Sequence, residues 1–304
     1  MTDPSPIKAA SVVYATSEEM ARNFDGQVQQ LIDTLQIAGG VTIMPAGVDV
    51  KQHTITGTLN SAAYTEGAQV PLSEFTTTAT SLGPITFKPY RKLTTLAAIQ
   101  KAGFIDAVLA TDDEMLRQMR LDVLSAFFSA LANGTGTASG ANLKAALLAA
   151  ENELTSAMEQ HGDSPTEAVY FVSRDDYQTW ATANDVHADG SGGVFGLQYI
   201  QNLGGIAGTV IRSSFVPTGT IYATASDNLH LYAPDYTAAN EGGLEFVTGD
   251  LGTIGVLHAG KNDYLSVETV AVSGLKVVPE YTNYVIVGTI GESAESAESA
   301  ESGE

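Results

Sequence analysis

The amino-acid sequence predicts an α+β fold in which one helix-bearing domain is interrupted by a second, α/β region. Three observations support this prediction. Residues 111–134 predict an amphipathic helix long enough to cross a small domain. Residues 53–87 are rich in Thr, Ser and Gly and alternate like strands, yet they hold few core residues. Beyond residue 141, helical and strand-like segments alternate until about residue 255.

The N-terminal part predicts an extended arm followed by a helix. The first 16 residues contain Pro4 and Pro6 and show no hydrophobic periodicity. A helix is expected from Ser17 to Ile37, because apolar residues recur there at three- and four-residue spacing. Ser17 suits the N-cap position, Gly26 would weaken the middle of the helix, and Gly39 would end it.

The segment from His53 to Phe87 predicts two extended strands, because it alternates in HTITGTL and GPITF. The strands would be joined loosely through Gly67 and Pro71. A polar two-stranded ribbon is marginally stable alone in water. Nothing nearby in the sequence supplies a surface for it, so we expect another copy of the chain to do so.

The long helix is marked at both ends. Thr111 followed by Glu114 fits a capping box, and Asp112 and Asp113 add negative charge where the helix dipole is positive. Gly134 suits a left-handed exit. Its predicted apolar face consists of Leu116, Met119, Val123, Leu124, Phe127, Phe128 and Leu131.

The segments on either side of the long helix are short. Residues 88–105 predict a strand leading into a short element that ends near Gly103. Residues 133–140, NGTGTASG, are expected to form a flexible connector. No Lys follows their last glycine, so they do not match a phosphate-binding loop.

The α/β region starts with an amphipathic helix over residues 141–162 and a short buried strand at 168–172. A short helix at 174–184, a glycine-rich loop at 189–196 and three short strands follow. The strand-rich segment from Tyr264 to Ile290 has no helix of its own. We therefore expect it to complete the sheet beside the long helix and to pack on the apolar face of that helix.

The C-terminal residues 291–304 repeat the triplet ESA. On a helix the glutamates would lie three residues apart and repel one another. Small size, polarity and like charge predict a disordered, solvated tail.

Composition excludes several classes of function. The formal charge of −21 opposes binding to nucleic-acid phosphates. The absence of Cys excludes disulfides, thiolate catalysis and Cys-based zinc sites. No apolar run is long enough to span a bilayer. The N-terminus lacks the basic start and apolar core of a signal peptide.

The positive charges are clustered. Of the 14 Lys and Arg residues, the following lie between positions 88 and 120: Lys88, Arg91, Lys92, Lys101, Arg117 and Arg120. They either pair with acidic surface, on this chain or on a neighbour, or form a solvated basic face.

The search for chemistry gives no catalytic residue, cofactor or metal site. The five His residues are scattered, without a metal-binding pair. Residues 185–196 faintly resemble a calcium loop, but Gly196 stands where the bidentate Glu belongs. Ser191 lies in no nucleophile elbow. Glu66 and Glu74 lie in the Thr-rich segment, which cannot desolvate either carboxylate for acid–base work.

Four stretches occur together in a characteristic order: AYTEGA at 63–68, ITFKP at 85–89, the long helix, and LSVETVAVSG at 265–274. In this layout the chain resembles the major capsid protein of tailed bacteriophages, which has the Hong Kong 97-type fold. The resemblance covers nearly the whole chain. It is carried by order and spacing, since each motif alone is weak.

The resemblance implies a division of the chain into named parts. These are an N-terminal arm and helix (1–49), an extended β-hairpin loop (50–88), a peripheral domain with the long spine helix (89–140), an axial α/β domain (141–257), closing peripheral strands (258–290) and a disordered acidic tail (291–304). The Thr-rich segment would then lie across a neighbouring subunit.

The implied function is self-assembly into the hexamers and pentamers of an icosahedral head that encloses double-stranded DNA without reading its sequence. The implied partners are copies of the chain, a portal, and separate scaffolding and decoration proteins, with no membrane. The protein would be assembled in the host bacterial cytoplasm and reside in the virion. The candidates for inter-subunit contacts are Tyr64, Glu66, Glu74, Lys88, Arg91, Lys92, Arg117 and Arg120.

Two departures from the family pattern matter. Some relatives cross-link covalently through a Lys in the extended loop, but residues 52–87 contain no Lys, so we expect no such chemistry. Some relatives also carry a long, charged scaffolding segment at the N-terminus. We expect the sequence before the loop to be too short for such a segment, and therefore a separate scaffolding protein or none.

Two other interpretations remain open at this point. An encapsulin-type compartment shell would have the same fold but would package cargo enzymes. A hydrolase using the glycine-rich loop at 189–196, with Ser191 and His187, belongs to a different class. It lacks a recognisable nucleophile and base.

Overall fold

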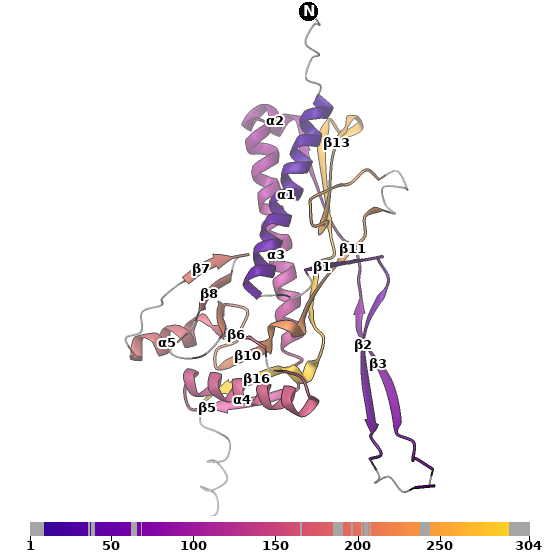
Figure 1. Ribbon diagram of the computed structural model, residues 1–304. Helices are drawn as coiled ribbons and strands as arrows, with labels where there is room; N and C mark the ends of the chain where they lie inside the picture. The colour runs from indigo at the N-terminus through magenta and orange to yellow at the C-terminus, as the bar shows by residue number, and fades with distance from the viewer. Residues whose placement is uncertain are drawn as a thin grey trace, which may run out of the picture.

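The structure is a computed structural model that describes residues 9–291. It leaves out residues 36, 38–39, 62–65, 68, 165, 185–190, 196, 202, 204–205, 207 and 238–243, and gives only the backbone for 9–15, 105–106, 184, 191–194 and 201. Figure 1 shows an elongated body with two long helices along it and a β-ribbon projecting from one side. The predicted disordered tail at 292–304 lies outside the described residues.

The N-terminal helix α1 runs without interruption from Ala9 to Leu35. The expectation of an extended arm is therefore wrong for residues 9–16, where alanines favour helix. Ser17 lies inside the helix rather than at its cap, and Gly26 does not divide it. The predicted apolar face is buried from Met20 to Leu35, as the periodicity indicates.

Among the described residues, no helix is both long and apolar enough to cross a membrane.

Replacing Gly26 by alanine is expected to stabilise the fold by about 0.5–1 kcal/mol. Gly26 is exposed, and a Cβ there would meet no atom within 4 Å. Alanine would lose less backbone entropy on folding without a clash. Urea unfolding of unassembled protein should show a higher midpoint. Gly249→Ala, whose Cβ would strike the Asp25 carboxylate, should lower the midpoint; a lower midpoint for Gly26→Ala would contradict this account.

The spine helix α3 (Ala110–Leu131) continues directly from the π-helical turn η1 (Ile105–Leu109). A separate short helix, α2 (Leu96–Ala102), precedes them. The short element ends at Gly103, as predicted, with φ of 85°. Since π-helical turns are short insertions in α-helices, the backbone is already helical where the spine helix begins.

The predicted capping box at Thr111 is wrong. Leu109, which precedes the helix, already has helical backbone angles and makes no side-chain cap. The Thr111 hydroxyl donates back to the carbonyl oxygen of Ala107 at 3.0 Å, as a residue within a helical run does. Glu114 accepts hydrogen bonds from Arg117 instead. Local cap signals were overridden by the continuous winding from η1.

The exit of the spine helix also differs from expectation. Gly134 does not have a positive φ. It permits a close approach instead, since a Cβ there would collide with Val285. The segment expected to be a flexible connector contains strand β5 (Gly136–Gly140), which pairs in parallel with β16 (Val285–Ile290). Gly136 likewise leaves room for Ile286.

A four-stranded antiparallel sheet lies along the upper body in the order β12-β13-β14-β4. Helix α1 packs against β12 and β13. Strand β14 is an inner strand of this sheet, so this part of the segment at 264–290 does complete a sheet, as the sequence predicts. The strands are β4 (Lys88–Thr95), β12 (Val247–Thr248), β13 (Ile254–Lys261) and β14 (Ser266–Ser273).

A three-stranded sheet joins distant parts of the chain in the order β1-β11-β15. Helix α3 packs against β15, which confirms contact between the spine and the closing segment. The strands are β1 (Val41–Met44), β11 (Leu229–Pro234) and β15 (Lys276–Pro279). Short 3-10 turns are η2 (Ser226–Asn228), η3 (Asn262–Tyr264) and η4 (Thr282–Tyr284).

A seven-stranded sheet forms the lower body in the order β5-β16-β10-β6-β9-β8-β7. Helix α4 (Leu143–His161) packs against β5, β16 and β10, and α5 (Arg174–Asn184) packs against β6 and β9. The other strands are β6 (Ala168–Ser173), β7 (Ser191–Val194), β8 (Leu197–Gln201), β9 (Thr209–Ser213) and β10 (Thr220–Ala225).

Two expectations about this sheet are corrected. The closing segment does not lie wholly beside the long helix, because its last strand, β16, pairs with β10 in the seven-stranded sheet. The glycine-rich segment at 189–196 is not only a loop, since β7 pairs antiparallel with β8. Strand β16 pairs with strands that are distant in sequence. Strand β7 pairs with β8, which follows it after a turn.

The apolar face predicted for the spine helix is buried throughout. Its lower end meets the seven-stranded sheet through aromatic rings. Phe127 and Phe128 lie edge-on to Phe171 of β6, with ring centroids 5.4 and 5.5 Å apart, and Phe128 stacks on Phe215. The spine helix therefore joins the upper sheet, the three-stranded sheet and the seven-stranded sheet into one body.

Candidate assembly surface

Strands β2 (Asp49–Thr58) and β3 (Glu74–Pro84) form an antiparallel ribbon, as predicted, which we call the arm. The second strand lies earlier than expected, because residues 85–87 of the stretch GPITF are not in a strand. It projects from the body at the lower right of Figure 1. Every described residue from 55 to 77 is exposed, except Ser73, which is half-buried. Ile55 is 65% and Phe75 58% exposed. The arm thus contributes little to the core and presents apolar side chains to solvent.

The arm is anchored at its root by a lysine of the body. The Lys276 ammonium of β15 donates to the carbonyl oxygens of Leu82 at 2.6 Å and Gly83 at 3.1 Å. Burial lowers the pKa of Lys276, and the nearby Asp49 carboxylate acts in the opposite direction. Ile85, fully buried beside the arm, closes the root through backbone hydrogen bonds. The direction of the arm is therefore set by the body.

Replacing Lys276 by methionine should loosen the root while leaving the body folded. The substitution removes the donor to two carbonyls and keeps the apolar stem. We expect amide hydrogen exchange in β2 and β3 to rise about 5- to 30-fold, which corresponds to about 1–2 kcal/mol. Lys88→Met is the control, because Lys88 is exposed and has no ion pair with any described residue. Equal exchange in both variants would contradict this role.

The predicted contact residues of the arm remain candidates. Tyr64 lies outside the described residues. Glu66 and Glu74 are exposed on the arm, and Lys88 is exposed where β4 begins. Arg120 is half-buried on α3, and its Nε has no hydrogen-bond partner in the described part of the chain.

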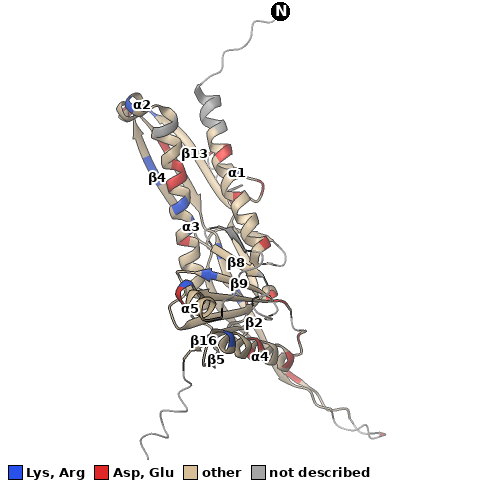
Figure 2. Cartoon of the chain, turned by 90° about the vertical axis from the view of Figure 1, so that its left-hand side faces the viewer, with Lys and Arg blue, Asp and Glu red and all other residues tan. Residues whose placement is uncertain are grey.

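Two of the basic candidates have partners within the chain. Arg91 pairs with Glu268, which also holds Lys261 at 3.1 Å, and these bonds lower the pKa of the Glu268 carboxyl. Arg117 pairs with Glu114 at 2.5 Å and lowers the pKa of that carboxyl to about 2. Figure 2 shows basic residues on β4 and both acidic and basic residues along α3. For these residues the acidic surface lies on the same chain.

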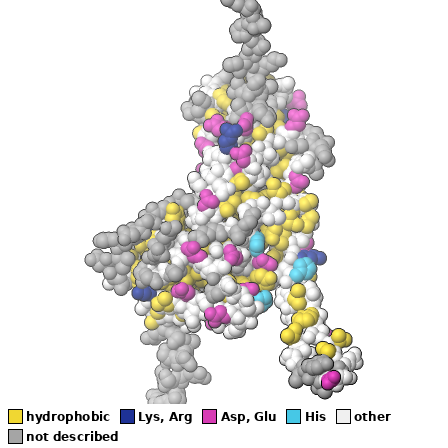
Figure 3. Space-filling model, in the orientation of Figure 1, with side chains coloured by type: hydrophobic (Ala, Val, Ile, Leu, Met, Phe, Trp, Pro, Cys, Tyr) yellow, Lys and Arg dark blue, Asp and Glu magenta, His cyan; other side chains and the backbone are white. Residues whose placement is uncertain are grey.

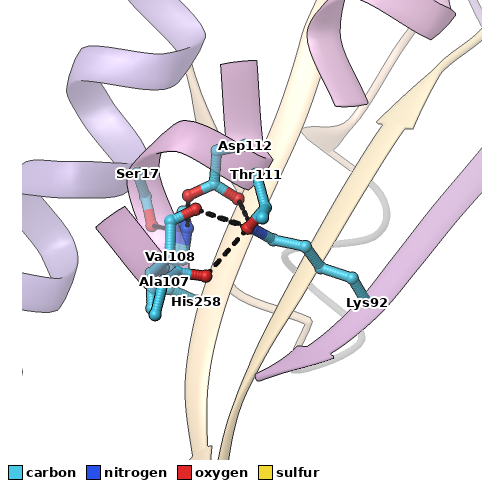
Figure 4. A network of polar contacts seen from close by, with 7 residues as sticks. All are labelled: Ser17, Lys92, Ala107, Val108, Thr111, Asp112 and His258. Carbon is cyan, nitrogen blue, oxygen red and sulfur yellow. Dashed lines mark hydrogen bonds and ion pairs between the residues drawn. The ribbon is translucent and has the colours of Figure 1, made fainter. Parts of the chain in front are cut away.

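Lys92 belongs to a polar network inside the body (Figure 4). Its ammonium lies 2.7 Å from one carboxylate oxygen of Asp112 and also donates to the Thr111 hydroxyl. The other Asp112 oxygen lies 3.0 Å from Nε2 of His258, whose Nδ1 is 2.7 Å from the Ser17 hydroxyl. The Lys92 side chain is only 19% exposed. Its partners therefore lie within this chain.

A second buried carboxylate fixes the position of α1. Asp25, which is 3% exposed, accepts backbone hydrogen bonds from Leu251 at 2.7 Å, Gly252 at 3.1 Å and Thr253 at 3.3 Å. The Thr253 hydroxyl also donates to it. The turn before β13 is thus held on α1 by a single side chain, as at a helix cap.

Sequence reasoning missed these anchoring residues. Asp112 was interpreted only as a charge at the helix dipole, although it is buried. Asp25 had a usable signal, since it lies on the same helical face as Ala21 and Val28, which are fully buried. His258 and Lys276 carried no local signal, because their partners are more than 100 residues away.

The described residues contain no group of three or more His, Asp and Glu that could hold a metal ion. The structure does not place the side chains of the hydrolase interpretation. Ser191 lies in β7, where only the backbone is described, and His187 lies outside the described residues. The calcium-loop residues 185–190 and 196 also lie outside the described residues. A cavity of about 480 Å³ lies between α4 and α5. Two of its polar groups already have structural partners: Asn142 caps α4, and Asp176 accepts from the Gly219 amide.

Solved structures with a similar fold were found. A structure described as Gordonia phage Cozz has a TM-score of 0.51 and 14% identity, covering 87% of each chain. The capsid structure of the cyanophage P-SCSP1u has a TM-score of 0.50 and 11% identity, covering 86% of this chain and 88% of the other. The mature capsid of bacteriophage PhiM1 has a TM-score of 0.50 and 8% identity, covering 83% and 85%.

No protein-family profile and no curated protein sequence matches the chain. At these low identities, the structural similarities establish the fold and not the relationship of the proteins. The chain has the Hong Kong 97-type capsid fold, with the long spine helix and the projecting arm that the sequence predicts.

Proposed function

We propose that the chain is the major capsid protein of a tailed bacteriophage, and that its copies assemble into the hexamers and pentamers of an icosahedral head around double-stranded DNA. The arm is the observation that carries this proposal. It is anchored firmly at its root, yet from residue 55 to 77 it has no buried residue in the described chain. A two-stranded ribbon of this kind needs a surface to lie on.

The electrostatics suit this role. A net charge of −21 keeps an inner wall from adhering to packaged DNA, because like charges repel. Residues 52–87 contain no Lys, so the proposed shell would be held by burial and charge pairing rather than by a covalent link through the arm. A portal and separate scaffolding and decoration proteins are the further partners that we propose, with assembly in the bacterial cytoplasm before the virion is complete.

Electron microscopy of the purified full chain tests the proposal. We expect hexamers, pentamers or closed shells, and particles from infected cells should contain DNA. Shells that contain a cargo enzyme and no DNA would replace the phage head by a compartment shell of the same fold. A chain that stays monomeric at all concentrations and salt conditions would refute both.

The division into domains that the resemblance implies becomes part of this proposal, with changed boundaries. The upper sheet with the spine helix would be the peripheral domain, and the seven-stranded sheet with α4 and α5 would be the axial domain at the capsomer centre. Strand β16 would belong to the axial domain rather than to the closing peripheral strands, because its partners β5 and β10 lie there.

A further inference from the structure

The two faces of the arm differ sharply in chemistry. The strand register pairs Ile55 with Thr77 and Gly57 with Phe75, and residues two apart on a strand share a face. We call this side, with His53 and Ala79, the apolar face. The opposite side, the threonine face, consists of Gln52, Thr54, Thr56, Thr58, Glu74, Thr76, Thr78 and Thr80.

The apolar face is built around one aromatic ring. A Cβ at Gly57 would collide with the Phe75 ring, so the ring lies over the glycine on the opposite strand. Phe75 and Ile55 nevertheless remain 58% and 65% exposed. Figure 3 shows hydrophobic side chains along the arm in this view. Beyond the strands, Leu59, Val70 and Leu72 near the tip are at least 70% exposed. The arm keeps apolar area uncovered that its own ribbon cannot bury.

The threonine face does not need a partner that covers it. Its threonines pair directly across the strands, Thr54 with Thr78 and Thr56 with Thr76. Such pairs favour the extended ribbon, and their hydroxyl groups can remain hydrated. The two faces therefore have different requirements for a partner, and water suffices for one of them.

Charge indicates what the partner is. Between residues 52 and 87 there is no Lys or Arg, and the only acidic residues are Glu66 and Glu74. Apart from Lys51 at its root, the arm has no Lys or Arg with which to hold nucleic-acid phosphate. It can approach another acidic copy of this chain with little added repulsion, whereas contact between the bodies of two chains, each chain having a net charge of −21, would add much more.

We infer that the arm docks on a second copy of this chain through its apolar face, with Phe75 and Ile55 buried in the contact, and that the threonine face stays open to water. This inference rests on the proposed function, because it names the face of the arm that makes the assembly contact.

Thiol protection tests the inference, because the chain has no cysteine of its own. Four single variants form two matched pairs of neighbours on opposite faces: Phe75→Cys with Thr76→Cys, and Ile55→Cys with Thr56→Cys. Each is reacted with a maleimide, first as unassembled subunits and then as shells. Circular dichroism checks that each variant is folded.

Assembly should slow the reaction at positions 75 and 55 by more than about tenfold, and at 76 and 56 by less than about threefold, because burial excludes the reagent from one face only. Loss of assembly in Phe75→Cys but not in Thr76→Cys would also support the inference. Equal protection on both faces, protection of the threonine face, or protection of position 75 before assembly would overturn it. If the wild-type chain forms no shell, the proposed function falls as well, so the two failures are distinguishable.

Discussion

A chain in which residues 55–77 are replaced by Asn-Gly is expected to fold as a monomer and to form no shells. Thr54 and Thr78 are cross-strand partners, so a two-residue turn can join them without a change of register. The excised segment holds no buried residue in the described part of the chain. The root, including the bonds from Lys276 to Leu82 and Gly83, is retained.

The thermal midpoint of this arm-excised chain should lie within about 4 °C of the unassembled wild type, because about 1 kcal/mol or less of core packing is lost. Shell yield, counted on micrographs, should fall below detection. A monomer that unfolds would show that the arm belongs to the core. Normal shells from the arm-excised chain would show that the arm is dispensable for assembly.

Asp112→Ala is expected to destabilise the body by about 3–5 kcal/mol, because removal of one partner of a buried ion pair leaves the other without compensation. Asp112 is 3% exposed and holds Lys92 and His258 at the start of the spine helix. Its loss therefore affects four elements at once, since Ser17 on α1 is joined to it through His258 on β13, and Lys92 comes from β4.

Asp113→Ala is the matched control. It lies next to Asp112 on the same helix but is exposed, so its removal should cost no more than about 0.5 kcal/mol. Urea unfolding in the arm-excised chain measures both values without a contribution from assembly. The double variant Asp112→Ala with Lys92→Met should recover part of the loss, because no unpaired ammonium remains. Equal effects of Asp112→Ala and Asp113→Ala would show that the network has no special role.

Predictions from the sequence were correct for elements with a periodic pattern of apolar residues. They were wrong where close packing between distant segments decides the local conformation. The apolar rows of α1 and α3 and the alternation in HTITGTL were correct, since each reflects a face that repeats along the chain. The strand expected at GPITF was wrong, because β3 ends at Pro84. Thr111 and Glu114 had the residues of a capping box, but η1 winds directly into α3. Gly134 resembled a helix exit, but its lack of a Cβ leaves room for Val285.

The assembly surface was predictable in outline and not in detail. An unpartnered Thr-rich ribbon could be inferred from composition alone. The sequence could not show which basic residues are free. Arg91 pairs with Glu268 and Lys92 with Asp112, and only the fold brings these residues together. The same holds for β16, whose parallel pairing with β5 joins segments about 150 residues apart and has no local signature.

A reconstruction of the assembled particle by electron cryomicroscopy tests the central claim most directly, which is that the arm links one copy of the chain to the next. The account predicts that each arm lies on the body of a neighbouring copy in every capsomer, with Phe75 inside the contact. Shells in which each arm extends into solvent, or folds onto its own body, would contradict it.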